Sequence, residues 1–191
     1  MGKHQVIVSS RKLNYYLIVR HNEFLIELPQ LDNAFDPDAL WNGCQSNESH
    51  INESYGVKCW EVKPDQKEVA HIFSQINQDI MEKPLIGWLM YKYQDKWLKP
   101  HIDKDRDAIL MFPIEPINYK ISFLDNEQDL NTVYEHTYTC PTIVNSNRLH
   151  CVYDHGIERK FFQISLFFKD YSWDNVINYV SNGQLLHQTV Q

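Results

Sequence analysis

The chain contains His101, Asp103 and a later His150, three side chains that together can bind a divalent metal ion. Two imidazoles and one carboxylate on the same face of a metal form the triad typical of non-haem iron(II) sites. Such a triad leaves further coordination positions open for small ligands and for oxygen. We therefore take these three residues as the candidate metal ligands.

The spacing of the three residues fits extended backbone. Residues two apart on a β-strand leave the same face, so His101 and Asp103 can converge on one point if they lie on a strand. His150 comes far enough along the chain to arrive from another strand. The H-x-D pattern alone is weak evidence, because a turn pair or a surface ion pair has the same sequence.

Other histidines compete for the third ligand position. His155 follows His150 closely, but Gly156 comes next and is typical of an exposed turn, so His150 is favoured. His136 lies in a polar stretch, and His71 lies beside an apolar stripe. Both are interpreted as surface or packed residues.

Two neighbours of the triad have ordinary interpretations. Arg106 lies among Lys104, Asp105 and Asp107, and a charged turn of this kind is expected to be solvated. Cys151 follows His150 and is expected to pack as a small apolar residue, since no second soft ligand is close in sequence.

Short apolar, β-branched or aromatic runs predict the strands that would position these residues. The runs cover residues 5–8, 15–19, 87–93, 108–114, 120–124, 137–144 and 161–168. Many short strands with few helices favour a mainly β sandwich or barrel with flanking helices, such as a jelly roll whose inward side chains surround a ligand.

Two helices are predicted beside the sheets. The first covers about 66–82, where an apolar stripe repeats at three and four residue steps and Asp65 can cap the first turn. The second begins near Ser172 and stops at Gly183. Residues 31–55 are rich in Asp, Asn, Ser and Pro and are expected to be irregular.

Length and composition indicate one globular domain over residues 1–191, with N-terminal strands, loop and helix in 1–86, a core at about 87–168 and a last helix at about 172–182. The net charge of -7, with 18 Lys and Arg against 25 Asp and Glu, argues against a nucleic-acid partner. No apolar run is long enough to span a membrane. Four cysteines without a C-x-x-C pair and an N-terminus without a signal pattern favour reduced thiols in the cytoplasm.

Two stretches resemble the core of the iron(II)- and 2-oxoglutarate-dependent oxygenases, a double-stranded β-helix superfamily related to the cupins. They are KPHIDKDRDAILMFPIEP, which holds the H-x-D, and NSNRLHCVYDHGIERKFFQISLF, which holds the distal histidine. The similarity covers about 87–168, a little under half of the chain. The second stretch is most similar to the prolyl-hydroxylase-like and aspartyl/asparaginyl-hydroxylase-like branches, where H-x-V recurs, here His150-Cys151-Val152.

The resemblance implies roles for further residues. Arg159, nine residues after His150, would pair with the distal carboxylate of 2-oxoglutarate, since guanidinium binds carboxylate through two hydrogen bonds. Tyr91 matches a tyrosine that helps bind the same cosubstrate, although Tyr93 shares its strand face. The R-x-S ending of many members is absent, and Ser165 lies further along.

The implied reaction is oxidative. Iron(II), 2-oxoglutarate and O2 would together hydroxylate an unactivated C–H bond of a peptidyl or small-molecule substrate, releasing succinate and CO2. Two alternatives stay open from the residues alone. One is a cupin-like metal enzyme that does not use 2-oxoglutarate, and the other is a non-catalytic jelly-roll binding module.

Overall fold

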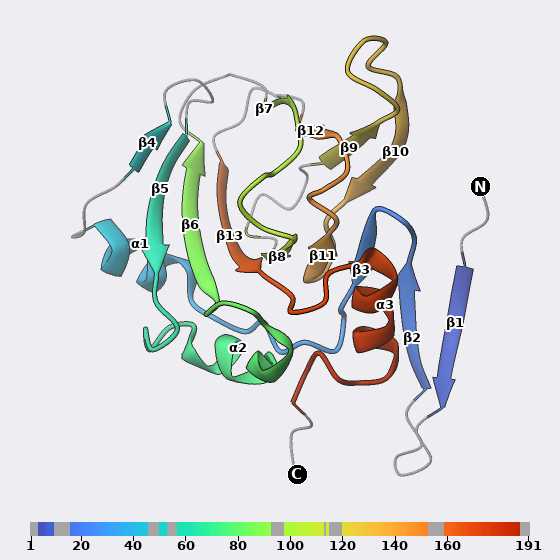
Figure 1. Cartoon of the computed structure of the whole chain (residues 1–191). Coiled ribbons are helices and arrows are strands. Elements are labelled where there is room, and N and C mark those ends of the chain that lie inside the picture. Colours follow the sequence, from blue (N-terminus) through green and yellow to red (C-terminus); the bar gives the residue numbers. More distant parts are fainter. Residues whose placement is uncertain are drawn as a thin grey trace.

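The computed structural model describes residues 4–9, 16–45, 50–52, 57–92, 98–112, 114, 120–152 and 159–187 (Figure 1). Its strands form two antiparallel sheets. The larger sheet has the order β1-β2-β3-β11-β8-β13-β6-β5-β4, and the smaller sheet has the order β10-β9-β12-β7. The strand bounds are β1 His4–Ser9, β2 Tyr16–His21, β3 Leu25–Glu27, β4 His50–Asn52, β5 Val57–Val62, β6 Ile86–Lys92, β7 Leu98–His101, β8 Ala108–Phe112, β9 Lys120–Leu124, β10 Thr132–Thr137, β11 Thr142–Val144, β12 His150–Val152 and β13 Arg159–Leu166.

The last eight strands form a jelly roll. β6 pairs with β13, β7 with β12, β8 with β11 and β9 with β10, all antiparallel. A long hairpin is therefore wrapped so that its paired strands alternate between the two sheets, which is the double-stranded β-helix. This confirms the predicted fold class, mainly β with flanking helices.

The larger sheet extends beyond this jelly roll on both sides. β5 and β4 continue it past β6, and β3, β2 and β1 continue it past β11. The runs predicted at 5–8 and 15–19 are thus the outer strands β1 and β2, which Figure 1 shows at one side of the molecule.

The β8 strand separates two hydrophobic cores. All five of its residues are buried. Ala108, Leu110 and Phe112 belong to the core that also receives helix residues, whereas Ile109 and Met111 belong to the core shared with β9. Because successive side chains leave opposite faces, a strand covered on both sides reads as a continuous apolar run. The second core is the inside of the barrel.

The first predicted helix is much shorter than expected. α2 covers Ala70–Gln75, and a separate 3-10 turn covers Gln78–Ile80. Asp65 does not cap it, because Val69 occupies the N-cap position and offers no side-chain bond. The break has a tertiary cause, since Ile76 takes extended backbone and forms an isolated β-bridge with Leu186. Of the five residues of the predicted apolar stripe, Val69, Ile72, Phe73 and Ile76 are buried and Ile80 is partly buried against the same core.

The segment 31–55 is not irregular throughout, which corrects the prediction. It contains α1, Pro37–Gln45, and the short β4. The Asp36 carboxylate accepts hydrogen bonds from the backbone N–H groups of Asp38 and Ala39, both at 3.0 Å, while Pro37 opens the helix. An Asp-Pro pair is a recognised helix start, so the signal was present in the sequence.

The C-terminal helix agrees with its prediction, whereas the run at 137–144 does not form one strand. α3 covers Trp173–Ser181, the Ser172 hydroxyl accepts from the Asn175 N–H at 3.1 Å, and Gly183 has φ of 66° after the helix. Between β10 and β11 the chain leaves the smaller sheet and enters the larger one, with Pro141 at the crossing. β10 stops pairing at Thr137 and β11 begins at Thr142, and Pro141, which has no N–H to give to a sheet, lies in this gap.

All four cysteines are free thiols. In the ranges that the structure describes, no helix has the length and apolar character needed to cross a lipid bilayer.

Candidate metal centre

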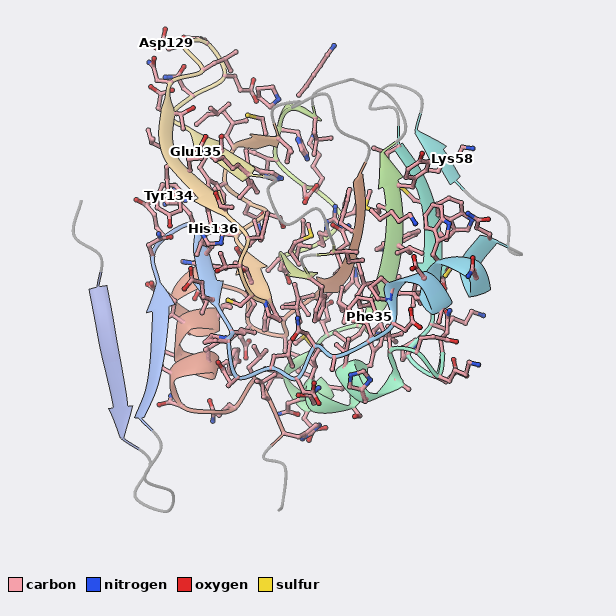
Figure 2. All side chains as sticks on the ribbon, turned by 180° about the vertical axis from the view of Figure 1, so that it is seen from behind. Phe35, Lys58, Asp129, Tyr134, Glu135 and His136 are labelled. Atoms are coloured by element: carbon pink, nitrogen blue, oxygen red, sulfur yellow. The ribbon has the colours of Figure 1, made fainter. Side chains whose placement is uncertain are left out.

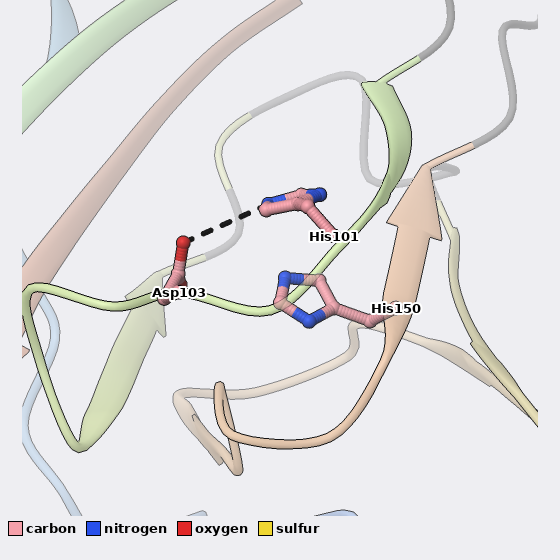
Figure 3. Close-up of side chains that lie close together, drawn as sticks. All are labelled: His101, Asp103 and His150. Carbon is pink, nitrogen blue, oxygen red and sulfur yellow. Dashed lines mark ion pairs between the residues drawn. The ribbon is translucent and has the colours of Figure 1, made fainter. Parts of the chain in front are cut away.

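The two histidines of the triad come from neighbouring strands of the smaller sheet. His101 is the last residue of β7 and His150 the first of β12. The antiparallel register places them opposite each other, with ring centroids 4.3 Å apart. Figure 3 shows both rings and Asp103 gathered at one place. The expectation that His150 arrives from a second strand is correct.

Both imidazoles are oriented by the main chain in the same way. Nδ1 of His101 lies 2.7 Å from the Lys99 carbonyl oxygen, and Nδ1 of His150 lies 2.8 Å from the Arg148 carbonyl oxygen. A carbonyl oxygen only accepts, so each Nδ1 carries the proton and each Nε2 keeps its lone pair. Metal-bound histidines are commonly held by such a bond from the second ring nitrogen.

Asp103 does not share the strand of His101, as the sequence had suggested, but lies in the turn that follows. Its N–H donates to the Ser146 carbonyl oxygen at 3.0 Å, which fixes the backbone at this point. One carboxylate oxygen, Oδ1, then lies 3.7 Å from Nε2 of His101. An anchored turn thus carries Asp103, in place of the strand face that His101 and Asp103 were expected to share.

One ligand atom from each of His101, Asp103 and His150 can be chosen so that all three lie within 4.8 Å of one another. Among the residues that the structure describes, no other group of three metal-ligating side chains meets this test. Two neutral nitrogen donors and one oxygen donor suit a divalent iron, manganese or cobalt ion. The donor set and its spacing therefore fit the metal that the sequence predicted.

Burial favours the neutral, metal-binding form of His150. Its exposed fraction is only 3%. Desolvation, with a further contribution from neighbouring His101, lowers the pKa of His150 below its ordinary value. At neutral pH the ring is therefore uncharged, and a nitrogen lone pair is available to bind a metal.

The triad lies in the wall of a cavity with a volume of about 480 Å³. The lining is mainly apolar and comes from both sheets: Val57, Met90, Leu98, Ile109, Met111, Ile121, Val144 and Phe161. Polar groups are few, and they include the triad, Arg106 and the buried Gln163. An apolar cavity with a few convergent polar groups is the usual form of a small-molecule site.

Arg106 belongs to this site, which corrects the expectation of a solvated turn. Its side chain is only 21% exposed, and Nε donates to Oδ2 of Asp103 at 3.0 Å. Nη1 donates to the Ser165 hydroxyl on β13 at 3.3 Å. The D-x-x-R spacing gives no hint of this burial, because Ser165 is distant in sequence.

Arg159 opens β13 at a register position opposite Lys92. Phe161 and Gln163, two and four residues further on, line the cavity. Alternation along a strand gives these three positions the same face. The Arg159 side chain lies outside the part of the chain that the structure describes.

Tyr91 is not brought into the cavity. Its neighbour Met90 lines the cavity, whereas the Tyr91 ring packs against Trp41 of α1, with centroids 5.2 Å apart. The two residues leave opposite faces of β6, so the ring lies on the side of the larger core. Tyr93, the alternative, lies outside the described residues. Among the described residues, Tyr138, which lies between β10 and β11, is the tyrosine that lines the cavity.

The competing histidines lie elsewhere or outside the described ranges. His136 is on β10, which β9 separates from β12 (Figure 2). It is a buried, packed residue, with its ring against Tyr138. His71 lies on α2, and His155 is outside the described residues. Cys151 packs with Leu124 and Leu149, as expected.

Ser146 is a further residue that the sequence did not single out. It is fully buried; its carbonyl accepts from Asp103, and its hydroxyl donates to the Arg106 carbonyl oxygen at 3.4 Å. Ser146 therefore ties the turn that carries Asp103 to the turn that precedes His150. The Asn-Ser-Asn run at 145–147 was a visible turn signal, but its partner across the barrel was not.

Comparisons with known proteins give structural similarity alone. No family model and no curated protein sequence matches the chain. A Pseudomonas putida prolyl-4-hydroxylase matches 70% of this chain and 86% of its own, with 14% identity and a TM-score of 0.48. HygX from Streptomyces hygroscopicus, with nickel, 2-oxoglutarate and hygromycin B bound, matches 78% of this chain and 84% of its own, with 7% identity and a TM-score of 0.49.

A third solved structure shows the same kind of similarity. Vicilin from Corylus avellana matches 64% of this chain but only 32% of its own length, with 9% identity and a TM-score of 0.42. The jelly-roll assignment itself rests on the strand order of the two sheets.

Proposed function

We propose that this chain is an iron(II)- and 2-oxoglutarate-dependent dioxygenase that hydroxylates a C–H bond of a peptidyl or small-molecule substrate. The observation that supports it best is the meeting of two histidines and one carboxylate in a cavity wall, with each imidazole oriented by a bond from Nδ1 to a main-chain carbonyl oxygen. His101, Asp103 and His150 would hold the iron. The iron and 2-oxoglutarate, when bound, supply the activation of O2 and the oxidation of the C–H bond.

The chain's own residues bind and enclose the reactants. Arg159, on the face of β13 that Phe161 and Gln163 share, is proposed to pair with the distal carboxylate of 2-oxoglutarate. The apolar lining excludes water, which strengthens the electrostatic attraction between such groups. Tyr91 is left out of this proposal because its ring packs against Trp41.

Anaerobic titration tests the proposal directly. The purified protein is loaded with iron(II), and 2-oxoglutarate is then added while the visible spectrum is recorded. Chelation of iron by 2-oxoglutarate is expected to produce a metal-to-ligand charge-transfer band. A folded, iron-loaded protein without this band would contradict the use of 2-oxoglutarate and favour a metal enzyme of the cupin type.

A protein that binds no iron at all would instead favour a binding module. If the band forms, the substrate can be sought by measuring succinate release in air with candidate peptides, amino acids and small metabolites. The expected result is a stimulation of succinate release by the true substrate above the slow uncoupled rate.

A further inference from the structure

We infer that Arg106 is a positioning residue that keeps Asp103 a one-oxygen metal ligand; this inference rests on the metal site of the proposed function. The carboxylate of Asp103 has two oxygens with different surroundings. Oδ2 accepts a hydrogen bond from Nε of Arg106 at 3.0 Å, whereas Oδ1 lies 3.7 Å from Nε2 of His101. Oδ2 is thus bonded to the guanidinium group of Arg106, and Oδ1 faces the imidazoles.

The guanidinium group is itself held in place. Nη1 of Arg106 donates to the hydroxyl of Ser165 at 3.3 Å, and Ser165 is a buried residue of β13. The planar fork therefore connects the ligand-bearing turn to a strand of the larger sheet. An arginine whose fork is fixed at two points loses little further freedom when the carboxylate binds a metal.

The backbone around Arg106 is anchored on both sides. The Arg106 carbonyl oxygen accepts from the Ser146 hydroxyl, and Asp103 N–H donates to the Ser146 carbonyl. At the next residue, the Asp107 N–H donates to the Leu166 carbonyl oxygen at 3.1 Å, and the Asp107 carboxylate accepts from the Phe168 N–H at 2.8 Å. The turn from Asp103 to Asp107 is consequently fixed to the end of β13 and to the loop between β11 and β12.

This arrangement determines how many coordination positions the protein occupies. A carboxylate can bind a metal through one oxygen or through two. Because the Arg106 bond holds Oδ2, only Oδ1 is free to bind, and a position that Oδ2 would fill stays open. A site that must accept a chelating cosubstrate and oxygen needs such open positions.

The test uses Mn(II) alone, without cosubstrate, in four variants of the whole chain. Arg106→Gln removes the guanidinium group. Arg106→Lys keeps the positive charge but cannot bridge Asp103 and Ser165. Ser165→Ala loosens the fork and leaves the ion pair. Lys104→Gln is the matched control, because it removes a positive charge from the same turn at an exposed side chain.

Calorimetry is expected to show an affinity for Mn(II) that is about 10- to 100-fold weaker in Arg106→Gln, the usual effect of removing a partner that orients a ligand. Arg106→Lys should lie between this variant and the wild type. Ser165→Ala should lose roughly 2- to 10-fold, as for one hydrogen bond. Lys104→Gln should remain within about twofold, since an exposed charge is well screened.

A second readout separates positioning from a general loss of structure. At saturating Mn(II), the relaxation of solvent water protons reports how many water molecules the bound ion exchanges. The relaxation enhancement is expected to fall in Arg106→Gln, because Oδ2 is then free to replace a water molecule. A protein that was merely loosened would not show this fall at saturation.

The outcomes are distinct. Equal Mn(II) affinity and equal relaxation in Arg106→Gln and Lys104→Gln would overturn the role of Arg106 while leaving the metal site intact. A wild-type protein that binds no Mn(II) would overturn the metal site itself, and with it the proposed function. If Arg106→Gln does not fold, Ser165→Ala decides, and an unchanged affinity there overturns the inference.

Discussion

His101 and His150 lie opposite each other in the antiparallel pairing of β7 and β12. Nδ1 of each ring donates to the carbonyl oxygen of the residue two positions earlier in the sequence. The register of the smaller sheet therefore fixes the distance between the rings, and the local main chain fixes their orientation. The two nitrogen donors are arranged before any metal binds, so little ordering is needed at binding.

The first prediction concerns the ligands themselves. His101→Ala and His150→Ala are each expected to abolish measurable iron(II) binding, because each leaves only one imidazole and one carboxylate. Anaerobic calorimetry checks this. His136→Ala is the matched control, since it also removes a buried histidine of the smaller sheet but one that lies on β10. Iron binding that survives in both ligand variants would contradict the assignment.

The second prediction separates metal from cosubstrate. Arg159→Ala is expected to leave iron affinity unchanged and to weaken 2-oxoglutarate by about 30-fold or more, as when one partner of a buried charge pair is removed (roughly 2 kcal/mol or more). The charge-transfer band, titrated with 2-oxoglutarate, measures the loss.

Lys160→Ala is the control for this second prediction. Lys160 is the next residue on β13, but its ammonium lies over the Trp41 ring, 4.7 Å from the centroid. It should therefore leave cosubstrate affinity nearly unchanged. Equal weakening of iron and cosubstrate in Arg159→Ala would contradict the role given to Arg159.

The parts of the site that the sequence predicted depend on local spacing. His101, Asp103 and His150 could be chosen because residue type and the period of strands are readable from the chain. The position of Arg106 could not be predicted, because its burial depends on two bonds, one to Asp103 and one to Ser165. Ser165 is distant in sequence and comes near Arg106 only in the folded barrel.

The fold was predicted to the same extent and for the same reason. β6, β8, β9, β11 and β13 overlap predicted apolar runs, whereas β7, β10 and β12 were not predicted as strands. The separation of β10 from β11 depends on which sheet each joins. α2 ends early because Ile76 bridges Leu186, a contact that no helical pattern contains. Tyr91 was assigned from the family resemblance, but the face of β6 on which it lies is set by packing against α1.

The third prediction tests close packing behind the site. A Cβ at Gly87 would lie 2.8 Å from the Val62 carbonyl oxygen and 2.9 Å from Cζ of Phe73. Gly87→Ala is therefore expected to lower the free energy of unfolding by about 1–3 kcal/mol, the usual cost of overpacking. Urea denaturation followed by tryptophan fluorescence measures the change.

Gly43→Ala is the control for the packing prediction. Gly43 lies in α1, and within the described ranges the contact outside the helix that a Cβ there would make is with Nε2 of Gln66 at 3.5 Å, an ordinary distance. Alanine in a helix is favoured over glycine, so this variant should gain up to about 1 kcal/mol. If both alanines had the same effect, the tight contact at Gly87 would not be the cause.

The fourth prediction concerns pH. His136 is 7% exposed, its Nε2 has no hydrogen-bond partner among the described residues, and burial lowers its pKa from 6.5 to about 4. In the unfolded chain the ring titrates near its ordinary pKa, so between these two values the unfolded state binds more protons than the folded state. Folding stability should therefore be lost as the pH falls from about 6.5 to 4.

The size of the effect follows from the shift. Each pKa unit corresponds to about 1.4 kcal/mol, so a shift from 6.5 to about 4 gives protonation of His136 an upper-limit cost of about 3.5 kcal/mol. The free energy of unfolding, measured in urea at intervals between pH 7 and pH 4, should decline more steeply in the wild type than in His136→Gln. Glutamine does not titrate, so the difference between the two slopes isolates this histidine from the carboxylates and from His150. Parallel slopes would show that His136 is protonated as readily in the folded protein as in the unfolded one.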